Sequence, residues 1–372
     1  KSFAYTTEES HLILRPLYLE GVEPVGSLGD DTPLSVLATK PRLIYSYFRQ
    51  RFAQVTNPPI DSYREHLVMS LFTYLGARKS LLSDSEDHAR LIRLESPILT
   101  NDQLSAIKAD EKSLSNITLS TLFEVGSGSD GLKKALANLC ENAEDAIDQG
   151  VELLILSDRG VTNKYAAIPM LIAIGAVHQH LIESRKRLQA SLIAEVGDAR
   201  EMHQFALLIG YGASAINPYL AFETIKELID QGHDQEVGES KALETYVKTI
   251  NKQLLKIMSK MGISTITGYH GAQIFEAIGL DQEVIDQCFT GTTSPVGGIG
   301  FKEIADESLK LHQSGFAADG ELKLDDFGFY RYRRNGEPHA FSPISVRTLH
   351  KSLEENGTGR DGYNNYLEQI GN

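Results

Sequence analysis

The alternation of short apolar strand-like runs with longer helix-like runs between about residues 117 and 216 most constrains the fold of this chain. The pattern predicts strands at 117–124, 151–157, 190–194 and 213–216, with helices at 130–149, 167–185 and 199–210 between them. Short connections between strands and helices in this order imply parallel strands joined by crossover helices. We therefore expect an α/β protein whose central part is a degenerate or open (β/α) barrel-like domain.

The sequence on either side of this region lacks the regular alternation of strands and helices. Before it, we expect helices over Leu43–Val55 and Ser62–Leu75, joined by a rigid turn at 57–61 because proline cannot continue a helix. After it, the pattern predicts helices at 239–260 and 271–279, and then loops and short hairpins beyond about residue 320. These differences suggest a mainly helical part at 1–115, a barrel-like part at 116–320 and a C-terminal extension at 321–372.

Two turns at the ends of predicted strands lack the composition of a phosphate site. In flavin-type barrels such turns are glycine-rich, because only bare backbone lets N–H groups approach a phosphate closely. Here Glu195-Val196-Gly197-Asp198 forms one turn and Asn217-Pro218-Tyr219 the other. Carboxylates and a proline stand where amide donors would be needed, so we expect this scaffold to have no phosphate site there.

Several other segments each have two interpretations. The loop 126–131 and the glycines at 297–300 could cradle an anion, although ordinary helix capping by Ser129 or Asp130 explains the first as well. Asp158-Arg159 follows a strand at the end where barrel active sites lie, but an ion pair that fixes the loop is an equal alternative. At the same edge, Glu195, Asp198 and Arg200 are expected to satisfy one another.

The histidine, cysteine and methionine spacing predicts no metal or redox site. His178 and His180 point to different faces of a helix, and His203 lies on another helix, so no helical metal pair forms. Cys140 and Cys288 are far apart in sequence and are expected to be buried thiols. In the segment KIMSKMG, both methionines are expected in the core.

Charge and hydropathy exclude some classes of partner. With 50 acidic and 36 basic residues the formal charge is −14, which repels nucleic acid and anionic membranes. No apolar run reaches the roughly 18 residues of a membrane span, and the first residues do not resemble a signal peptide. The sequence therefore suggests the cytoplasm, or the plastid stroma in a plant or alga. Because the first residue is Lys1 rather than Met, we expect a processed product or a piece of a longer protein.

Long blocks of this sequence resemble the central domain of the large subunit of glutamate synthase, essentially from end to end. The blocks are FAQVTNPPIDSYREHLVMSL (52–71), LLILSDRG (153–160), IPMLIAIGAVHQHLI (168–182), EVGDAREMHQFALLIGYGASAINPYLAFE (195–223), KIMSKMGISTITGYHGAQIFEAIGL (256–280) and FTGTTSPVGGIG (289–300). A shorter match, GEPHAFSP, resembles the segment just before that family's FMN-binding barrel.

The resemblance implies that this chain is one part of an oxidoreductase that makes glutamate from glutamine and 2-oxoglutarate. The parent enzyme uses an N-terminal cysteine to release ammonia, an internal channel, FMN and a 3Fe-4S cluster. Its electron donor is ferredoxin, or a small NADPH-oxidising subunit. Two cysteines, neither of them N-terminal, supply neither the cluster's three thiolates nor the amidotransferase nucleophile. We therefore expect no cofactor, metal site or catalytic residue in this chain, and no activity from it in isolation.

The role that the resemblance implies is a scaffold between the glutaminase and FMN domains that contributes to the ammonia channel. A channel wall should offer small hydroxyls, amides and apolar groups rather than carboxylates that would trap ammonium. The candidates are Thr56, Asn57, Met69, Ser70 and Thr100. Two alternatives stay open. One is a free-standing enzyme that binds a phosphorylated ligand or flavin at 126–131 and 297–300, with Asp158 or Lys164 in the chemistry. The other is a regulatory module for an amino acid, which no motif supports.

Overall fold

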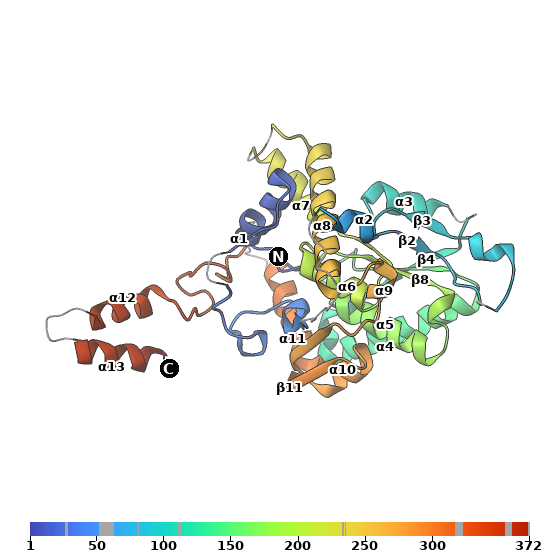
Figure 1. The fold of residues 1–372 in the computed structure, drawn as a ribbon. Helices are drawn as coiled ribbons and strands as arrows, with labels where there is room; N and C mark the ends of the chain where they lie inside the picture. The colour runs from blue at the N-terminus through green and yellow to red at the C-terminus, as the bar shows by residue number, and fades with distance from the viewer. Residues whose placement is uncertain are drawn as a thin grey trace.

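The computed structural model describes most of the chain, and Figure 1 shows its arrangement. The described residues are 1–26, 29–51, 63–80, 82–110, 113–232, 234, 236–316, 323–353 and 359–370. Within these residues no helix is both long enough and apolar enough to cross a membrane.

A four-stranded parallel sheet with the order β4-β6-β8-β9 forms the centre of the fold. Its strands are β4 (Asn116–Ser120), β6 (Leu153–Ser157), β8 (Ser191–Glu195) and β9 (Ala215–Asn217). The crossovers are α4 (Gly128–Asp148), α5 (Met170–Glu183) and α6 (Met202–Gly210). Beyond β9, Ile98 forms a parallel bridge with Ile216, which continues the sheet by one short extended segment. The predicted parallel α/β architecture is confirmed.

Both faces of this sheet are covered, which explains why its middle strands are continuous apolar runs. All five residues of β6 and of β8 are buried. Alternate side chains face opposite layers: Ile155 and Ile193 pack with α3 (Asn101–Ala109), whereas Leu154 and Leu192 join the larger core. Figure 1 shows the same division, with α3 above the sheet and α4 and α5 below it.

Three smaller sheets surround the central one. The largest pairs β1 (Phe48–Gln50) antiparallel with β10 (Phe275–Leu280), which in turn runs parallel to β11 (Thr293–Ile299). The other two are antiparallel pairs: β2 (Thr73–Leu75) with β3 (Ile92–Leu94), and β5 (Leu122–Glu124) with β7 (Tyr165–Ala167).

The remaining helices lie around these sheets. The chain begins with α1 (Thr7–Glu9), continued by π-helical turns at Ser10–Leu14 and Pro16–Glu20. The other α-helices are α2 (Glu65–Val68), α7 (Tyr219–Asp230), α8 (Glu239–Met261), α9 (Ile266–Tyr269), α10 (Gln282–Cys288), α11 (Phe301–Gly315), α12 (Pro343–Ser352) and α13 (Gly359–Ile370). Short 3₁₀ turns occur at Ser35–Leu37, Ile44–Tyr47, Glu86–Ala89, Val125–Ser127 and Arg187–Gln189. Figure 1 shows α12 and α13 as a helical hairpin that projects away from the rest of the molecule.

Several predicted elements are wrong in type. The described part of Leu43–Val55 is a 3₁₀ turn followed by β1, because Tyr45, Tyr47 and Phe48 are all buried and Phe48 pairs with a strand. In the predicted helix Ser62–Leu75, the described residues 63–75 contain the short helix α2 followed by β2. The predicted helix at 271–279 overlaps strand β10, which is held between β1 and β11.

Other differences concern breaks and missed helices. The strand predicted at 117–124 is divided into β4 and β5, which belong to different sheets. Helix α7 was not predicted, because Pro218 was interpreted only as part of a turn, whereas it precedes the first residue of the helix. The tail is not limited to loops and hairpins, because it contains α12 and α13.

Candidate functional site

The carboxyl ends of β6, β8 and β9 meet at one edge of the central sheet, where ligands bind in many parallel α/β proteins. The polar residues that follow these strands are Asp158 and Arg159 after β6, Asp198 and Arg200 after β8, and Tyr219 after β9. We call this edge the sheet mouth. Asp158, Asp198 and Arg200 are each at most 5% exposed, so their partners must come from the protein itself.

The Asp158 carboxylate lies where an anion bound by the backbone N–H groups of this turn would lie. Its two carboxylate oxygens accept hydrogen bonds from the Gly197 N–H at 3.0 and 2.8 Å, and it also bonds the hydroxyl of Tyr219. Burial, together with the nearby Asp198 carboxylate, raises the pKa of Asp158 well above its usual range, against the opposing effect of these hydrogen bonds. The amide at the tightest point of the 195–198 turn is therefore already paired within the chain.

Asp198 occupies the second such position, at the N-terminus of α5. Its carboxylate accepts a hydrogen bond from the Met170 N–H at 3.3 Å and from the Tyr45 hydroxyl at 2.6 Å. A helix N-terminus is a general anion site because its first N–H groups lack helical partners. Burial raises the pKa of Asp198, and the hydrogen bonds oppose that shift. A side chain of the protein thus fills the place of a bound anion.

Glu195, the last residue of β8, makes two ion pairs at the rim of the sheet mouth. Lys108 lies 2.8 Å away and Arg159 lies 2.7 Å away, and the Arg159 guanidinium also stacks 3.9 Å over the ring of Tyr219. Burial alone would raise the pKa of Glu195, but hydrogen bonds from Lys108, Ser157 and Arg159 lower it. Arg159 therefore fixes its neighbouring loop through Glu195 rather than through Asp158.

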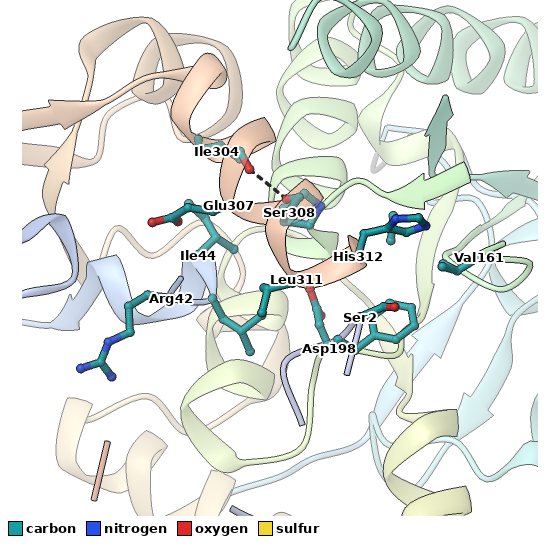
Figure 2. A pocket seen from close by; sticks show the side chains of 14 residues that line it. Ser2, Arg42, Ile44, Val161, Asp198, Ile304, Glu307, Ser308, Leu311 and His312 are labelled. Carbon is teal, nitrogen blue, oxygen red and sulfur yellow. Dashed lines mark hydrogen bonds between the residues drawn. The ribbon is translucent and has the colours of Figure 1, made fainter. Parts of the chain in front are cut away.

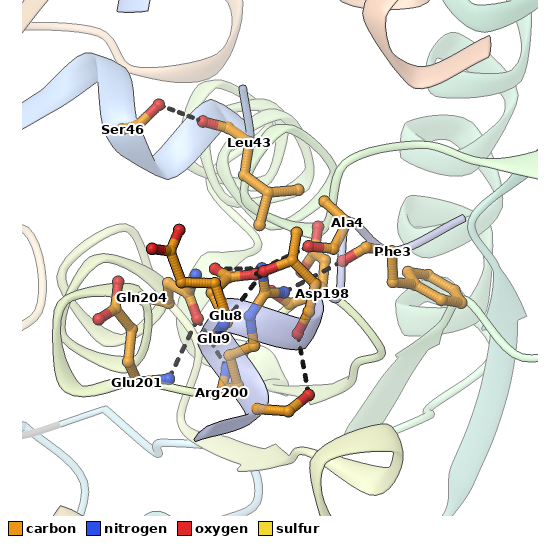
Figure 3. A network of polar contacts seen from close by, with 12 residues as sticks. Phe3, Ala4, Glu8, Glu9, Leu43, Ser46, Asp198, Arg200, Glu201 and Gln204 are labelled. Atoms are coloured by element: carbon orange, nitrogen blue, oxygen red, sulfur yellow. Dashed lines mark hydrogen bonds and ion pairs between the residues drawn. The ribbon is translucent and has the colours of Figure 1, made fainter. Parts of the chain in front are cut away.

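Arg200 binds the N-terminal segment of the chain across the sheet mouth, as Figure 3 shows. Its guanidinium donates to the carbonyl oxygens of Phe3 at 3.1 Å and Ala4 at 2.9 Å, and to the Glu9 carboxylate at 2.7 Å. It also lies 4.4 Å over the ring of Tyr5. Burial lowers the pKa of Arg200, but the attraction of Glu9 and Tyr5 outweighs burial and the pKa is raised.

Phe3 closes the mouth over the turn that follows β8. A Cβ atom built on Gly197 would lie only 2.9 Å from the Phe3 ring, so the glycine permits this close approach. The expectation that Glu195, Asp198 and Arg200 satisfy one another is wrong: their side chains pair with Lys108, Tyr45, Glu9 and other groups. The contact among the three is a 3.4 Å bond from Arg200 to the backbone carbonyl of Asp198.

Two cavities lie beside the N-terminal segment. The smaller, about 40 Å³, is lined by Phe3, Leu43, Asp198, Leu311 and other residues, and has room for about one water molecule. Figure 2 shows these side chains, with the Arg42 guanidinium directed away from Leu311 and Asp198. The larger cavity, about 650 Å³, shares Arg42 and Leu43 with the first and extends past Glu201 and Tyr330.

The two candidate anion loops have other structural roles. In the first, Gly128 begins α4 and the Ser127 hydroxyl donates to the Glu124 carbonyl at 2.6 Å, so capping by Ser129 or Asp130 is not what begins the helix. In the second, residues 297–299 belong to β11, and Gly300 immediately precedes α11. Lys164 is exposed on the loop that pairs with Val125.

The two histidines of α5 have separate partners, and the cysteines and methionines belong to the core as predicted. His178 accepts a hydrogen bond from Arg187, whereas His180 pairs with Glu144 on the opposite side. Within the described ranges, no cluster of three or more His, Cys, Asp or Glu residues could hold a metal ion. Cys140 and Cys288 are free buried thiols whose pKa values are raised by burial. Met258 is fully buried, and Met261 packs against the core.

The channel-wall candidates do not form one cluster. Thr56 and Asn57 lie outside the described residues. Met69 is buried, and Ser70 forms a parallel bridge with Thr265. Thr100 lies near the sheet mouth, because the adjacent Leu99 carbonyl accepts a hydrogen bond from Asn217 at the end of β9. Its hydroxyl already accepts from the Gln103 N–H at 3.2 Å as the cap of α3.

Sequence reasoning missed the residues that complete the sheet mouth. Glu9, Tyr45 and Lys108 supply partners for the carboxyl-edge residues, and each comes from the N-terminal part of the chain. Glu201, which lines the larger cavity beside the network, was not singled out either. One signal was present in the sequence: several polar residues follow the strands of the sheet mouth. Buried polar groups need hydrogen-bond partners, so some of these partners had to come from other parts of the chain.

These features define a class of protein: an α/β domain whose ligand-binding edge is occupied by its own side chains and N-terminal segment. The family model described as the glutamate synthase central domain matches residues 1–281. The chain belongs to this family.

Curated relatives agree with the family over almost the whole chain. The NADPH glutamate synthase large chain of Bacillus subtilis is 44% identical over 96% of this chain and 23% of its own length. Ferredoxin-dependent glutamate synthase 2 of Synechocystis is 44% identical over 98% of this chain and 24% of its own length. The NADH glutamate synthase of Schizosaccharomyces pombe is 39% identical over 95% of this chain and 17% of its own length. The chain thus spans about a quarter or less of these relatives.

Solved structures give only distant likenesses. A mandelate oxidase mutant with benzaldehyde has a TM-score of 0.36 at 10% identity, covering 66% of this chain and 91% of its own. A flavocytochrome b2 mutant with benzoylformate has a TM-score of 0.35 at 11% identity, and the match covers 60% of this chain and 45% of that chain. Likenesses at this level carry no argument about the chain.

Proposed function

We propose that this chain is the inter-domain scaffold of a glutamate synthase, joining its glutaminase domain to its FMN domain and forming part of the ammonia channel. The parent enzyme would make glutamate from glutamine and 2-oxoglutarate, with ferredoxin or a small NADPH-oxidising subunit as electron donor. Membership of the family and the relatives that are about four times longer support a role as one part of such a polypeptide.

The observation that carries the scaffold role is the filling of the sheet mouth by the protein itself. Asp158 and Asp198 take the Gly197 and Met170 N–H groups, and Arg200 is committed to residues 3–9. An FMN phosphate would have to displace two buried carboxyl groups and would lie against remaining negative charge. The residues present therefore do not fit FMN, and the same holds for an iron–sulfur cluster, because Cys140 and Cys288 are two thiols rather than three.

The channel role rests on chemistry that suits neutral ammonia. Ammonia should pass through a lining that excludes bulk water and has no free carboxylates. The candidates Thr100, Ser70 and Met69 offer hydroxyl or apolar surface, and Thr56 and Asn57 remain candidates on sequence alone. Thr100 is the most informative position, because it lies beside the sheet mouth while its hydroxyl has a defined structural partner.

The test uses full-length glutamate synthase with this chain in place. Thr100→Phe and Ser70→Phe should let glutamine hydrolysis exceed glutamate formation, because a bulky side chain obstructs transfer between the sites. Thr100→Ser, which keeps the cap of α3, and Ser70→Ala are matched controls and should leave the two rates coupled. Coupled rates in both phenylalanine variants would remove these two residues from the channel wall.

A separate measurement tests the scaffold role against a flavin- or phosphate-binding enzyme. The isolated 372-residue chain should show no flavin absorbance after purification, no heat of binding with inorganic phosphate, and no turnover of glutamine or 2-oxoglutarate. Bound flavin, or binding of inorganic phosphate by the unaltered chain, would contradict the scaffold proposal whatever the channel variants do.

A further inference from the structure

The larger of the two cavities has the size and lining of a small-molecule site. Its volume of about 650 Å³ falls within the range of about 300–1,000 Å³ that is usual for ligand pockets. It is bounded by the N-terminal helical turns, the segment 41–49, the beginning of α6 and the residues around Tyr330. Ala4, Glu9, Tyr45 and Arg200 of the sheet-mouth network line one side of it, so the cavity adjoins the sheet mouth.

The cavity is rich in arginine although the chain as a whole is acidic. Four arginines line it, Arg42, Arg49, Arg200 and Arg331, in a protein whose formal charge is −14. Arg200 is paired with Glu9, and Asp30 in the same lining attracts Arg42. Arg49 and Arg331 have no ion pair with another described residue, so the cavity keeps guanidinium groups for a ligand. Arginine binds carboxylates through paired hydrogen bonds, so this lining favours a ligand with a carboxylate group.

Arg42 is held in place while keeping capacity for a further partner. Its Nη2 donates to the Thr32 hydroxyl at 2.8 Å, and its guanidinium stacks 3.7 Å over the ring of Phe329. Its Nε is buried without a hydrogen-bond partner. Burial lowers the pKa of Arg42, against the attraction of Glu337 and other acidic groups. An anion in the cavity would supply the hydrogen-bond acceptor that the buried Nε lacks.

Arg49 adds a second, more accessible guanidinium. Its Nη1 donates to the backbone carbonyls of Ser46 at 3.0 Å and Phe48 at 3.1 Å, which holds one terminal nitrogen of the guanidinium group against the backbone at the beginning of β1 and leaves Nη2 and Nε for a ligand. The residue is exposed, so a ligand can reach the guanidinium from solvent.

Glu201 places a carboxyl group of unusual pKa in the same cavity. Burial, reinforced by the negative charge of Glu9 and opposed by Arg200, raises the pKa of Glu201 to about 7. Glu201 forms no ion pair with any described residue. A carboxyl group in this state gains a partner when a cation or a hydrogen-bond donor comes beside it.

We propose that this cavity binds an α-amino acid, whose carboxylate pairs with Arg42 and Arg49 and whose ammonium group pairs with Glu201. A zwitterion suits both parts of the lining, because its carboxylate can pair with the arginines and its ammonium group with Glu201, which has no ion pair among the described residues. A dicarboxylate or inorganic phosphate could pair with the arginines, but its negative charge would be repelled by the Glu201 carboxylate. The site is independent of the proposed channel, because none of the described channel candidates lines it.

The experiment is calorimetric titration of the 372-residue chain with each of the standard L-amino acids, together with inorganic phosphate and glutarate. The tightest amino acid is then compared with its analogues that lack the amino group or the carboxylate. Both analogues should bind at least tenfold more weakly, because a hydrogen bond to a charged group contributes about 1.5–3 kcal/mol. If no amino acid binds, or if phosphate, glutarate or the analogue without an amino group binds as tightly, the proposal fails.

Proton exchange during binding provides a second readout. An ammonium group beside Glu201 favours the ionised carboxyl, so binding near neutral pH should release a fraction of a proton and should tighten as the pH rises from about 6 to about 8. Titrations in buffers with different heats of ionisation measure this release. Uptake of protons would indicate a ligand that requires neutral Glu201 and would contradict the assignment.

Paired variants separate binding from folding. Glu201→Gln and Arg49→Gln should each weaken binding at least tenfold, and Glu201→Gln should abolish proton release. The matched controls Glu141→Gln and Arg185→Gln change exposed residues away from the cavity and should bind like the parent chain. Unchanged affinity in both cavity variants would overturn the proposal, even if the chain binds an amino acid elsewhere.

Discussion

Substitution of Arg200 by methionine tests whether the N-terminal segment is fixed to the sheet mouth by one buried guanidinium. Arg200 is 2% exposed and donates to Phe3, Ala4 and Glu9. Methionine fills a similar volume but leaves Glu9 as an uncompensated buried charge and two carbonyl groups without donors. Removing one partner of a buried ion pair costs about 3–5 kcal/mol, which is a large part of the 5–15 kcal/mol that stabilises a typical domain.

The assay is urea unfolding with linear extrapolation, combined with hydrogen exchange of the amides in residues 3–10. Arg200→Met should lower the free energy of unfolding by about 3–5 kcal/mol and should accelerate exchange in that segment. Arg185→Met, at an exposed site, should change stability by less than about 0.5 kcal/mol.

A double-mutant cycle identifies the cause. Arg200→Met combined with Glu9→Leu removes both charges. The double variant should therefore lose less free energy of unfolding than the two single variants together, by at least about 1 kcal/mol. Additive effects, or an Arg200→Met variant as stable as the Arg185→Met control, would refute the view that this ion pair fixes the segment.

Three further predictions concern the supporting structure. Burial, with Arg187 nearby, lowers the pKa of His178 from 6.5 to about 3, so the unfolded chain binds a proton first and stability is lost as the pH falls from 6.5 towards 3. In His178→Gln, urea unfolding at about pH 7 and about pH 4 should therefore show a smaller loss than in the parent chain, and an equal loss would contradict this. Gly175→Ala should destabilise by about 1–3 kcal/mol despite alanine's better helix propensity, because its Cβ would lie 2.4 Å from the Cys288 carbonyl oxygen; a thermal midpoint at or above that of the parent would disprove the clash. Thr100→Ala should cost about 0.5–2 kcal/mol through loss of the α3 cap while Thr100→Ser stays near the parent, and equal midpoints for both would show that the cap does not matter.

The central sheet could be predicted from sequence because its signals are local. β6 and β8 are uninterrupted apolar runs, and the longer helices α4 and α5 separate β4, β6 and β8 along the chain, so spacing alone identifies strands, helices and parallel order. The buried thiols and the absence of a helical histidine pair also follow from local spacing. The same reasoning fails for β10, whose segment 271–279 has residues compatible with a helix but is paired on both sides by other strands.

Some missed elements did carry a local signal. Ser342 caps α12 and Pro343 is its first residue, an arrangement that commonly begins a helix. Helix α7 has buried residues at Phe222, Ile225 and Ile229, which is the spacing of one helical face. For α7, Pro218 was interpreted as part of a turn, although proline is equally compatible with the beginning of a helix. For α12, the tail was assigned to loops and short hairpins.

The pairing at the sheet mouth could not have been predicted from one sequence. The partners of Arg200, Asp198 and Glu195 lie 191, 153 and 87 residues away along the chain, in Glu9, Tyr45 and Lys108. Residue types indicated that the carboxylates needed partners, but the choice of partner depends on how the N-terminal segment crosses the edge. The sequence-based expectation that the three neighbours pair with each other fails for this reason.

The sheet mouth has carboxyl groups at 158 and 198, rather than apolar residues, because the backbone there has donors without partners in regular structure. The N–H groups of Gly197 and Met170 lie at a strand end and a helix N-terminus, where regular structure supplies no acceptor. Apolar side chains at 158 and 198 would leave both donors buried without partners, at a cost of about 1–3 kcal/mol each. Burial raises the pKa of both carboxyls, which reduces the charge that must be kept away from water. The same donors that could hold a ligand's phosphate therefore hold the turn rigid, and a rigid turn gives Arg200 a fixed position from which to bind residues 3–9.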